Sequence, residues 1–331
     1  MKHGWLVAVA ALVACGKSST PTPVPAPHDH VALAKPGEPD DTCDPKIPKL
    51  CMGNDVVACE ADGHLGRRLR ACHKGCSNGS CDESCQDDNT KLIYIVSTSN
   101  DFLSFDPRKL PGNPVKRVGK LTCESYGSPF AMSIDRSGTA WVEYDDSEVF
   151  RVNITTAECE KSPAFTGPNG VFTMAFTTDP AGERLYTAIA TQAPELSVMD
   201  TKDLVRHGVG QITQPSDEPV DLTGTGDGKL FGFFSSFTEP SYVQELSRSG
   251  AVVGKRMPIG TTSLGGFSAW AFAQWGGSFY VFTTTGDRSS VHSVDRATGV
   301  SRTVISNLGY QISGAGVSTC APERDTGNVH P

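Results

Sequence analysis

The sequence predicts an all-β fold for most of its 331 residues, and three observations predict it. From Lys91 onward, short segments rich in Val, Phe, Tyr and Thr are separated by turns that contain Gly, Asp and Ser. No helical period of useful length runs through this region, whereas short runs of this composition are typical of strands. The third observation is that the pattern recurs at a fixed interval along the chain.

The repeat has a period of about 47 residues. An apolar strand ends in a polar turn residue at five positions, which are spaced by 47, 47, 47 and 48 residues: Asp106, Asn153, Asp200, Ser247 and Asp295. A unit of this length holds four strands, and four strands per unit are typical of one blade of a β-propeller. We therefore predict a five-bladed β-propeller over residues 91–322.

Hairpins and an unpaired C-terminal strand support this division of the chain into repeats. Four of the turns are preceded by a tight hairpin, in "SIDRSGTAWV", "TTDPAGERLY", "GTGDGKLFGF" and "AQWGGSFYVF", where Asp and Gly supply the turn conformations. The first repeat lacks such a hairpin, because it begins with the strand "KLIYIVS". The short apolar stretch 312–319 near the C-terminus has no partner after it. We expect it to be the missing innermost strand, which closes the ring and removes its free edges.

Eleven cysteines predict disulfide bonds in an exported chain. Cys85 and Cys320 lie at the two loose ends of the first repeat, so a bond between them would replace the missing hairpin. Cys123 and Cys159 are expected to pair on adjacent blades. Residues 42–85 form a small disulfide-rich module without enough apolar mass for its own core. We expect its other six cysteines to pair among themselves in one of fifteen ways: Cys43, Cys51, Cys59, Cys72, Cys76 and Cys81. A zinc site is disfavoured, because paired C-x2-C spacing is absent.

The N-terminus predicts export. Residues 1–15 contain an apolar run that is too short to cross a bilayer, which is typical of a cleaved signal. The stretch Leu12-Val13-Ala14-Cys15 resembles the lipobox of bacterial lipoproteins, which implies acylation of Cys15 and a membrane anchor. An ordinary secretory signal is the alternative. Residues 16–41 read as a Pro-rich linker and residues 323–331 as a disordered tail.

The string "CMGNDVVACEADGHLGRRLRACHKGCSNGSC" is similar to cysteine-rich modules that precede β-propellers in outer-membrane lipoproteins of the myxobacterial type. The resemblance covers residues 43–85 and, more loosely, the chain after residue 85. It implies the architecture and an outer-membrane location, and it implies no activity.

The sequence predicts a binding or scaffolding platform rather than an enzyme. It contains no GxSxG, HExxH, phosphate-loop or dinucleotide motif, and we expect no cofactor and no metal. His28 and His30 are candidate metal ligands, but they lie in the linker, and the favoured interpretation is that their side chains are simply solvated. A net charge of −8 argues against nucleic acid, which leaves a glycan, a peptide or an envelope protein as partner. The alternative is a glycan-acting enzyme, which needs two facing carboxyls, but the inner strands offer chiefly Asp221.

We expect a ligand on one face of the propeller. With the strands of a blade lettered a to d from the centre outward, the b-to-c and d-to-a connections meet on that face, around the channel. Aromatic and acidic side chains there could stack on a sugar or hold a cation, although solvated loops are often acidic for no functional reason. The b-to-c residues are Asp101, Asp146, Glu195, Glu239 and Asp287, and the d-to-a residues are Tyr126, Asn169, Asp217, Glu218 and Tyr310.

Overall fold

The structure is a computed structural model, and it describes most of the chain from Thr42 to Arg324. The predicted signal with Cys15, the linker and residues 325–331 lie outside the described residues. Within the described residues, no helix has the length and apolar character that a membrane crossing requires. The described ranges are 42–52, 55–71, 76–77, 79–81, 85, 87–162, 170–179, 182–189, 194–213, 219–236, 239–260 and 267–324.

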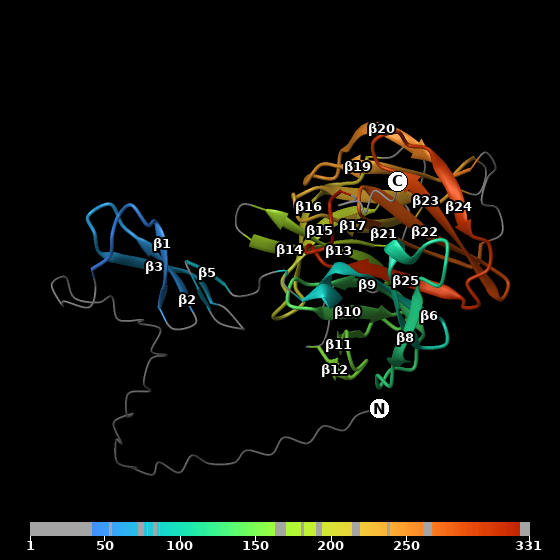
Figure 1. Ribbon diagram of the computed structural model, residues 1–331, viewed down its shortest axis with the longest axis horizontal. Helices are drawn as coiled ribbons and strands as arrows, with labels where there is room; N and C mark the ends of the chain where they lie inside the picture. The colour runs from blue at the N-terminus through green and yellow to red at the C-terminus, as the bar shows by residue number, and fades with distance from the viewer. Residues whose placement is uncertain are drawn as a thin grey trace, which may run out of the picture.

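The fold is all-β, and the described residues contain five four-stranded antiparallel sheets (Figure 1). We number them along the chain, each from its innermost strand outward. Sheet 1 consists of β25 (Ile312–Val317), β6 (Ile93–Ser97), β7 (Asp101–Phe105) and β8 (Val115–Lys120). Sheet 2 consists of β9 (Pro129–Ile134), β10 (Thr139–Tyr144), β11 (Val149–Asn153) and β12 (Cys159–Lys161). Sheet 3 consists of β13 (Phe172–Asp179), β14 (Gly182–Ile189), β15 (Glu195–Met199) and β16 (Arg206–Gln211). Sheet 4 consists of β17 (Val220–Gly224), β18 (Leu230–Phe234), β19 (Tyr242–Leu246) and β20 (Val252–Pro258). Sheet 5 consists of β21 (Ala269–Trp275), β22 (Ser278–Thr285), β23 (Arg288–Asp295) and β24 (Ser301–Ile305).

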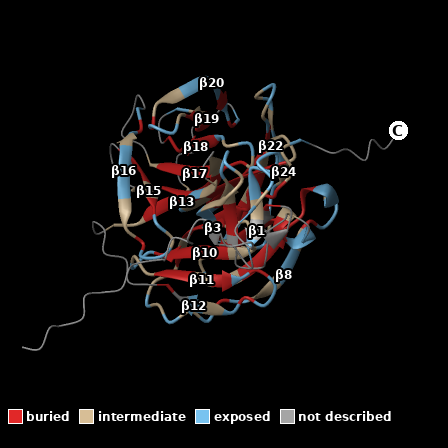
Figure 2. Ribbon diagram, turned by 90° about the vertical axis from the view of Figure 1, so that its left-hand side faces the viewer, coloured by how far each residue is buried: buried red, intermediate tan, exposed pale blue. Residues whose placement is uncertain are grey.

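The sheets are arranged around their innermost strands. Contacts run from β25 to β9, on to β13, β17 and β21, and from β21 back to β25. The inner strands are mostly buried, whereas no residue of the outer strands β8, β16 and β24 is buried (Figure 2). This arrangement is that of a β-propeller, so the predicted all-β class is confirmed.

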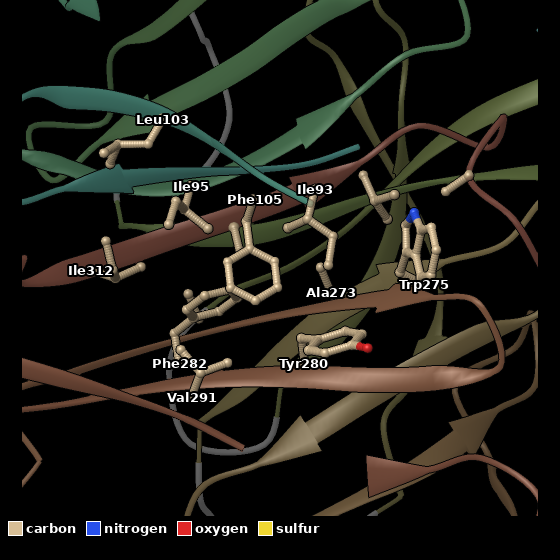
Figure 3. Packing of buried hydrophobic residues seen from close by; sticks show 14 residues of the cluster. Ile93, Ile95, Leu103, Phe105, Ala273, Trp275, Tyr280, Phe282, Val291 and Ile312 are labelled. Carbon is tan, nitrogen blue, oxygen red and sulfur yellow. The ribbon is translucent and has the colours of Figure 1, made fainter. Parts of the chain in front are cut away.

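The C-terminal strand lies where the repeat pattern predicts it. β25 pairs antiparallel with β6, with Ala315 opposite Ile95 and Val317 opposite Ile93. Figure 3 shows Ile312 of β25 beside Ile95, within the buried apolar cluster that joins sheets 1 and 5. A Cβ at Gly316 would lie 2.9 Å from the Ser133 Cα of β9, so glycine allows the two inner strands to approach closely.

Polar side chains link neighbouring inner strands. The Ser133 hydroxyl oxygen of β9 accepts a 2.9 Å hydrogen bond from the Phe176 N–H of β13. The Thr223 hydroxyl oxygen of β17 accepts one of 3.2 Å from the Gln274 N–H of β21. These bonds satisfy buried backbone donors that have no partner within their own sheet.

The five repeated turn residues all lie at the end of the third strand of a sheet: Asp106, Asp200 and Ser247 follow it directly, and Asn153 and Asp295 are its last residues. The Asn153 and Asp200 side chains each accept a 2.8 Å hydrogen bond from the backbone N–H two residues later. Asp106 accepts the corresponding bond, and Asp295 accepts one from the Thr298 N–H. These local hydrogen bonds are the physical reason that a short acceptor recurs at this position.

A smaller set of strands lies to one side of the propeller in Figure 1. β1 (Lys49–Met52), β2 (Asp55–Cys59) and β3 (Leu65–Ala71) form a three-stranded sheet, and β4 (Cys76–Ser77) pairs with β5 (Ser80–Cys81). Two short 3-10 helices, η1 (Asp88–Lys91) and η2 (Pro107–Lys109), complete the described elements.

Three disulfide bonds join described cysteines. Cys85–Cys320 and Cys123–Cys159 are both present, which confirms the two predicted pairings. Cys43 pairs with Cys59, which settles one bond of the module that spacing left open. The remaining four cysteines lie outside what the structure describes of the side chains, and their pairing stays a prediction: Cys51, Cys72, Cys76 and Cys81.

Candidate functional site

The strand order places the described residues of the predicted ligand face at one end of the propeller. Two tyrosines lie in connections that lead from an outer strand to the next inner strand, namely Tyr126 and Tyr310. Five acidic residues lie between or next to the second and third strands of successive sheets: Asp101, Asp146, Glu195, Glu239 and Asp287. Asn169, Asp217 and Glu218 lie outside the described residues.

Two of these carboxylates organise their own loops. The Asp146 Oδ2 accepts hydrogen bonds from the Ser125 hydroxyl at 2.7 Å and from the Tyr126 N–H at 3.1 Å. Partial burial raises the pKa of Asp146, but these bonds outweigh it, so that its pKa lies below the ordinary value. Asp101 forms a 2.8 Å ion pair with Arg117 of the outer strand β8. Both side chains therefore have structural partners.

The two predicted tyrosines do not share a site. Tyr126 is fully exposed. Tyr310 lines a groove between β8 and β24, together with Val115 and Ile305, and Tyr126 is not part of that groove. The two tyrosines therefore do not line one common groove, and their contact with a ligand stays a prediction.

A pocket of 210 Å³ lies where the five innermost strands begin, and we call it the axial pocket. Each innermost strand contributes one or more residues, so the pocket lies where the innermost strands of the five described sheets come together. It is lined by Thr98, Ser128, Pro129, Phe130, Asp145, Thr173, Asp221, Ser268, Ala269, Trp270 and Ser313. Concave sites with aromatic walls and a few polar groups are the usual sites for small ligands.

Asp221 is the predicted residue that the structure places in this pocket. Its side chain is buried against β21, and Oδ1 accepts a 2.8 Å hydrogen bond from the Leu222 N–H. Burial raises the pKa of Asp221 to about 8, although backbone hydrogen bonds from Leu222 and Phe272 act in the opposite direction. At neutral pH this carboxyl is therefore mostly protonated.

None of the other ten lining residues was identified from the sequence, and three of them are Asp145, Phe130 and Trp270. Asp145 reaches it from the end of β10, with Oδ1 accepting a 2.9 Å hydrogen bond from the Ser128 N–H. The repeat pattern selected its neighbour Asp146, but the pairing of β10 with β9 shifts register between Glu143 and Tyr144. Phe130 and Trp270 are the second residues of β9 and β21. Their position near the start of a predicted inner strand was the sequence feature that could have identified them as lining residues.

The opposite mouth of the ring is crossed by residues 318–323, which we call the C-terminal strap. Thr319 donates a hydrogen bond to Glu183 of sheet 3, and the Arg136 Nε of sheet 2 donates to Thr319 at 3.2 Å. Glu323 accepts a 2.6 Å bond from the Gly226 N–H of sheet 4 and pairs with Arg296 of sheet 5 at 3.2 Å. The strap thus contacts the hairpins β9–β10 and β17–β18, the start of β14 and the turn between β23 and β24. It extends past residue 322, the predicted end of the propeller.

Glu183 makes stability depend on pH. Burial raises the pKa of Glu183 from 4.5 to about 7, against the lowering effect of hydrogen bonds from Thr319 and the Arg136 backbone. An acid with a raised folded-state pKa stabilises the fold fully below its unfolded value and loses that contribution as the pH rises through 7. We expect the melting temperature of the wild type to fall between pH 5 and about 7.5 more than that of Glu183→Gln. Parallel slopes for the two proteins in a thermal denaturation series would contradict this.

Another carboxyl, Glu143, is fully buried between sheets 2 and 3. It accepts hydrogen bonds of 3.0 and 3.1 Å from the Phe172 N–H, and burial raises its pKa well above the ordinary value. It does not line the axial pocket. Its role is therefore to satisfy the buried N–H at the start of β13.

In the described part of the chain, no three or more His, Cys, Asp or Glu side chains form a group that could hold a metal ion. His292 is engaged by the hydroxyls of Thr283 and Thr303 on the same sheet. No histidine is among the described residues of the axial pocket.

No family model matches the sequence, and no curated protein matches it. Among solved structures, a chain of a nidogen–laminin complex is 12% identical with a TM-score of 0.42, covering 83% of this chain and 98% of that one. A TolB-like protein from Agrobacterium tumefaciens is 13% identical with a TM-score of 0.40, covering 70% and 87%. YCF48 bound to D1 peptide is 11% identical with a TM-score of 0.34, covering 65% and 63%. At this level of similarity, the fold and the site rest on the chain's own geometry.

Proposed function

We propose that this chain is a lipid-anchored protein of the outer membrane whose propeller binds a small ligand, or one end of a larger one, in the axial pocket. In this proposal the five described sheets are the five blades, and the pairing of β25 with β6 closes the ring. The observation that carries it is the axial pocket, to which all five innermost strands contribute and which holds Asp145, Asp221, Phe130 and Trp270.

The rigid construction of the pocket supports a binding role. Lining side chains are hydrogen bonded to neighbouring inner strands, as Thr173 is to the Val220 carbonyl and Ser313 is to the Pro129 carbonyl, so they are held in place before a ligand arrives. Preorganisation of this kind lowers the entropic cost of binding. The loops around the pocket add further area for a glycan, a peptide or an envelope protein.

A binding screen tests this proposal. The fragment from Asp41 onward, immobilised and exposed to glycans and peptides, should retain a ligand that Trp270→Ala binds at least tenfold more weakly. Asp200→Ala, at a turn on the opposite face, should bind it like the wild type. A ligand lost with Asp200→Ala but kept with Trp270→Ala would place the binding site elsewhere.

The anchor has its own test. Because acylation requires the thiol of the lipobox cysteine, Cys15→Ala should leave the exported protein unprocessed or soluble. Detergent phase separation measures this directly: the wild type should enter the detergent phase and the variant the aqueous phase. Equal partitioning of the two would contradict lipid anchoring.

An enzyme acting on glycans is the second candidate, since Asp145 and Asp221 both line the axial pocket. A protonated Asp221 and a second carboxyl are the two groups that glycoside hydrolysis uses. Turnover of a polysaccharide by the wild type, lost in Asp221→Asn, would favour this candidate over a binding protein.

A further inference from the structure

We propose that the axial pocket recognises a primary ammonium group, carried either on a sugar-sized ring or at the end of an alkyl chain. This inference rests on the proposed function of the pocket and adds the chemical class of its ligand. Three features of the described residues carry it: the direction of the hydrogen bonds, the charge of the lining and the size of the pocket.

Four of the five hydroxyls in the lining are acceptors toward a ligand. Each of the four donates its single proton to an oxygen atom of the protein, so only its lone pairs remain available. Ser313 donates to the Pro129 carbonyl at 2.7 Å, Thr173 to the Val220 carbonyl at 3.0 Å, Thr98 to the Gln311 Oε1 at 3.0 Å and Ser268 to the Thr284 carbonyl at 3.4 Å. A ligand rich in donors fits such a lining, and an ammonium group has three donors and no acceptor.

The charge of the lining has one sign. Asp145 and Asp221 are the titratable side chains among the described residues of the pocket, and no Lys, Arg or His accompanies them. Phe130 and Trp270 add aromatic faces, and an aromatic face attracts a cation by about 0.5–2 kcal/mol. Carboxylates and aromatic faces together favour a positively charged group over a neutral or anionic one.

The size of the pocket limits what can enter. A volume of 210 Å³ corresponds to about seven water molecules at roughly 30 Å³ each, enough for one small ring or the end of a chain. A pocket of this volume receives a terminal group of a larger ligand rather than a whole polymer.

The proposal predicts a specific pH dependence of the affinity, because Asp221 carries a proton at neutral pH. A bound ammonium favours the ionised form of the facing carboxyl, so binding displaces the proton that Asp221 carries at neutral pH. The affinity for an amine that stays charged should therefore rise with pH and level off above about 8, near the pKa of the free site. A neutral ligand gains nothing from ionisation of Asp221.

Calorimetric titration of the fragment from Asp41 onward with matched probes tests the proposal. Glucosamine is compared with N-acetylglucosamine at pH 6, and Nα-acetyl-lysine amide with its Nε-acetylated form at pH 6 and pH 8.5. The charged member of at least one pair should bind about tenfold more tightly than its neutral partner. The pair that shows this preference identifies the carrier as a ring or as a chain.

Variants separate the ammonium site from the pocket itself. Asp221→Asn should lose both the preference for charge and the rise of affinity with pH, whereas Asp200→Asn should keep both; thermal denaturation confirms that each variant is folded. Equal or tighter binding of the neutral probes, or no binding of any probe, would overturn the ammonium proposal. The proposal that the axial pocket binds a ligand would still hold if another ligand from the screen required Trp270. If no ligand required Trp270, that proposal would be wrong as well.

Discussion

The double variant Cys85→Ser, Cys320→Ser should be less stable than the wild type by about 2–5 kcal/mol, the usual cost of removing a native disulfide. The bond joins residues 235 positions apart and ties the end of β25 to the segment that leads into β6. Breaking it releases a very long loop in the unfolded state, which raises the entropy of that state. Chemical denaturation monitored by tryptophan fluorescence measures the difference.

The double variant Cys123→Ser, Cys159→Ser is the matched control. Its bond has a sequence separation of 36, so its loop is much shorter. Since the entropy of closing a loop grows with (3/2)RT ln n, the longer loop should be worth about 1.5 kcal/mol more. If the two variants lose equal stability, the entropic account of the Cys85–Cys320 bond is wrong.

Phe282→Ala should cost about 3–5 kcal/mol, the range for removing a buried phenylalanine side chain. Phe282 is fully buried on β22, and its ring meets the edge of Phe105 of β7 at a centroid distance of 5.4 Å (Figure 3). The substitution leaves a cavity between sheets 5 and 1, where the beginning and the end of the repeat region meet. The midpoint of denaturant unfolding should fall accordingly.

Tyr126→Ala is the control for this prediction, because it removes an aromatic side chain that is fully exposed. We expect its stability to stay within about 0.5 kcal/mol of the wild type. A loss from Tyr126→Ala as large as that from Phe282→Ala would mean that burial in the structure does not report the packing of the protein in solution.

Much of the fold was predictable because local chemistry repeats. Asp106, Asn153, Asp200 and Asp295 each accept a hydrogen bond from a backbone N–H shortly after them, so the same residue types recur at each turn. The unpaired stretch near the C-terminus was predictable for a complementary reason, since a buried strand needs a partner. Within the cysteine-rich module, spacing alone could not select Cys43–Cys59 among fifteen pairings.

The site was less predictable than the fold. Asp221 was found because an acidic residue in an inner strand is unusual, but Asp145, Phe130 and Trp270 were missed. Their place in the axial pocket depends on where each inner strand begins and on the register shift at Glu143 and Tyr144. A shift of one residue moves a side chain to the other face of a strand, and composition does not reveal it. Tyr310 lies at the expected end of the propeller, but sequence could not show that its side chain lines the groove between β8 and β24.

The pairing of Val317 with Ile93 has a consequence for biogenesis. A ribosome makes a chain from its N-terminus, so β6 leaves it long before the strand that covers its inner edge exists. Until β25 arrives, β6 carries an unpaired edge, which is a template for aggregation. Final assembly therefore waits for almost the whole polypeptide, and contacts of such high sequence separation form slowly. A nascent or prematurely terminated chain should thus depend on chaperones far more than the finished protein does.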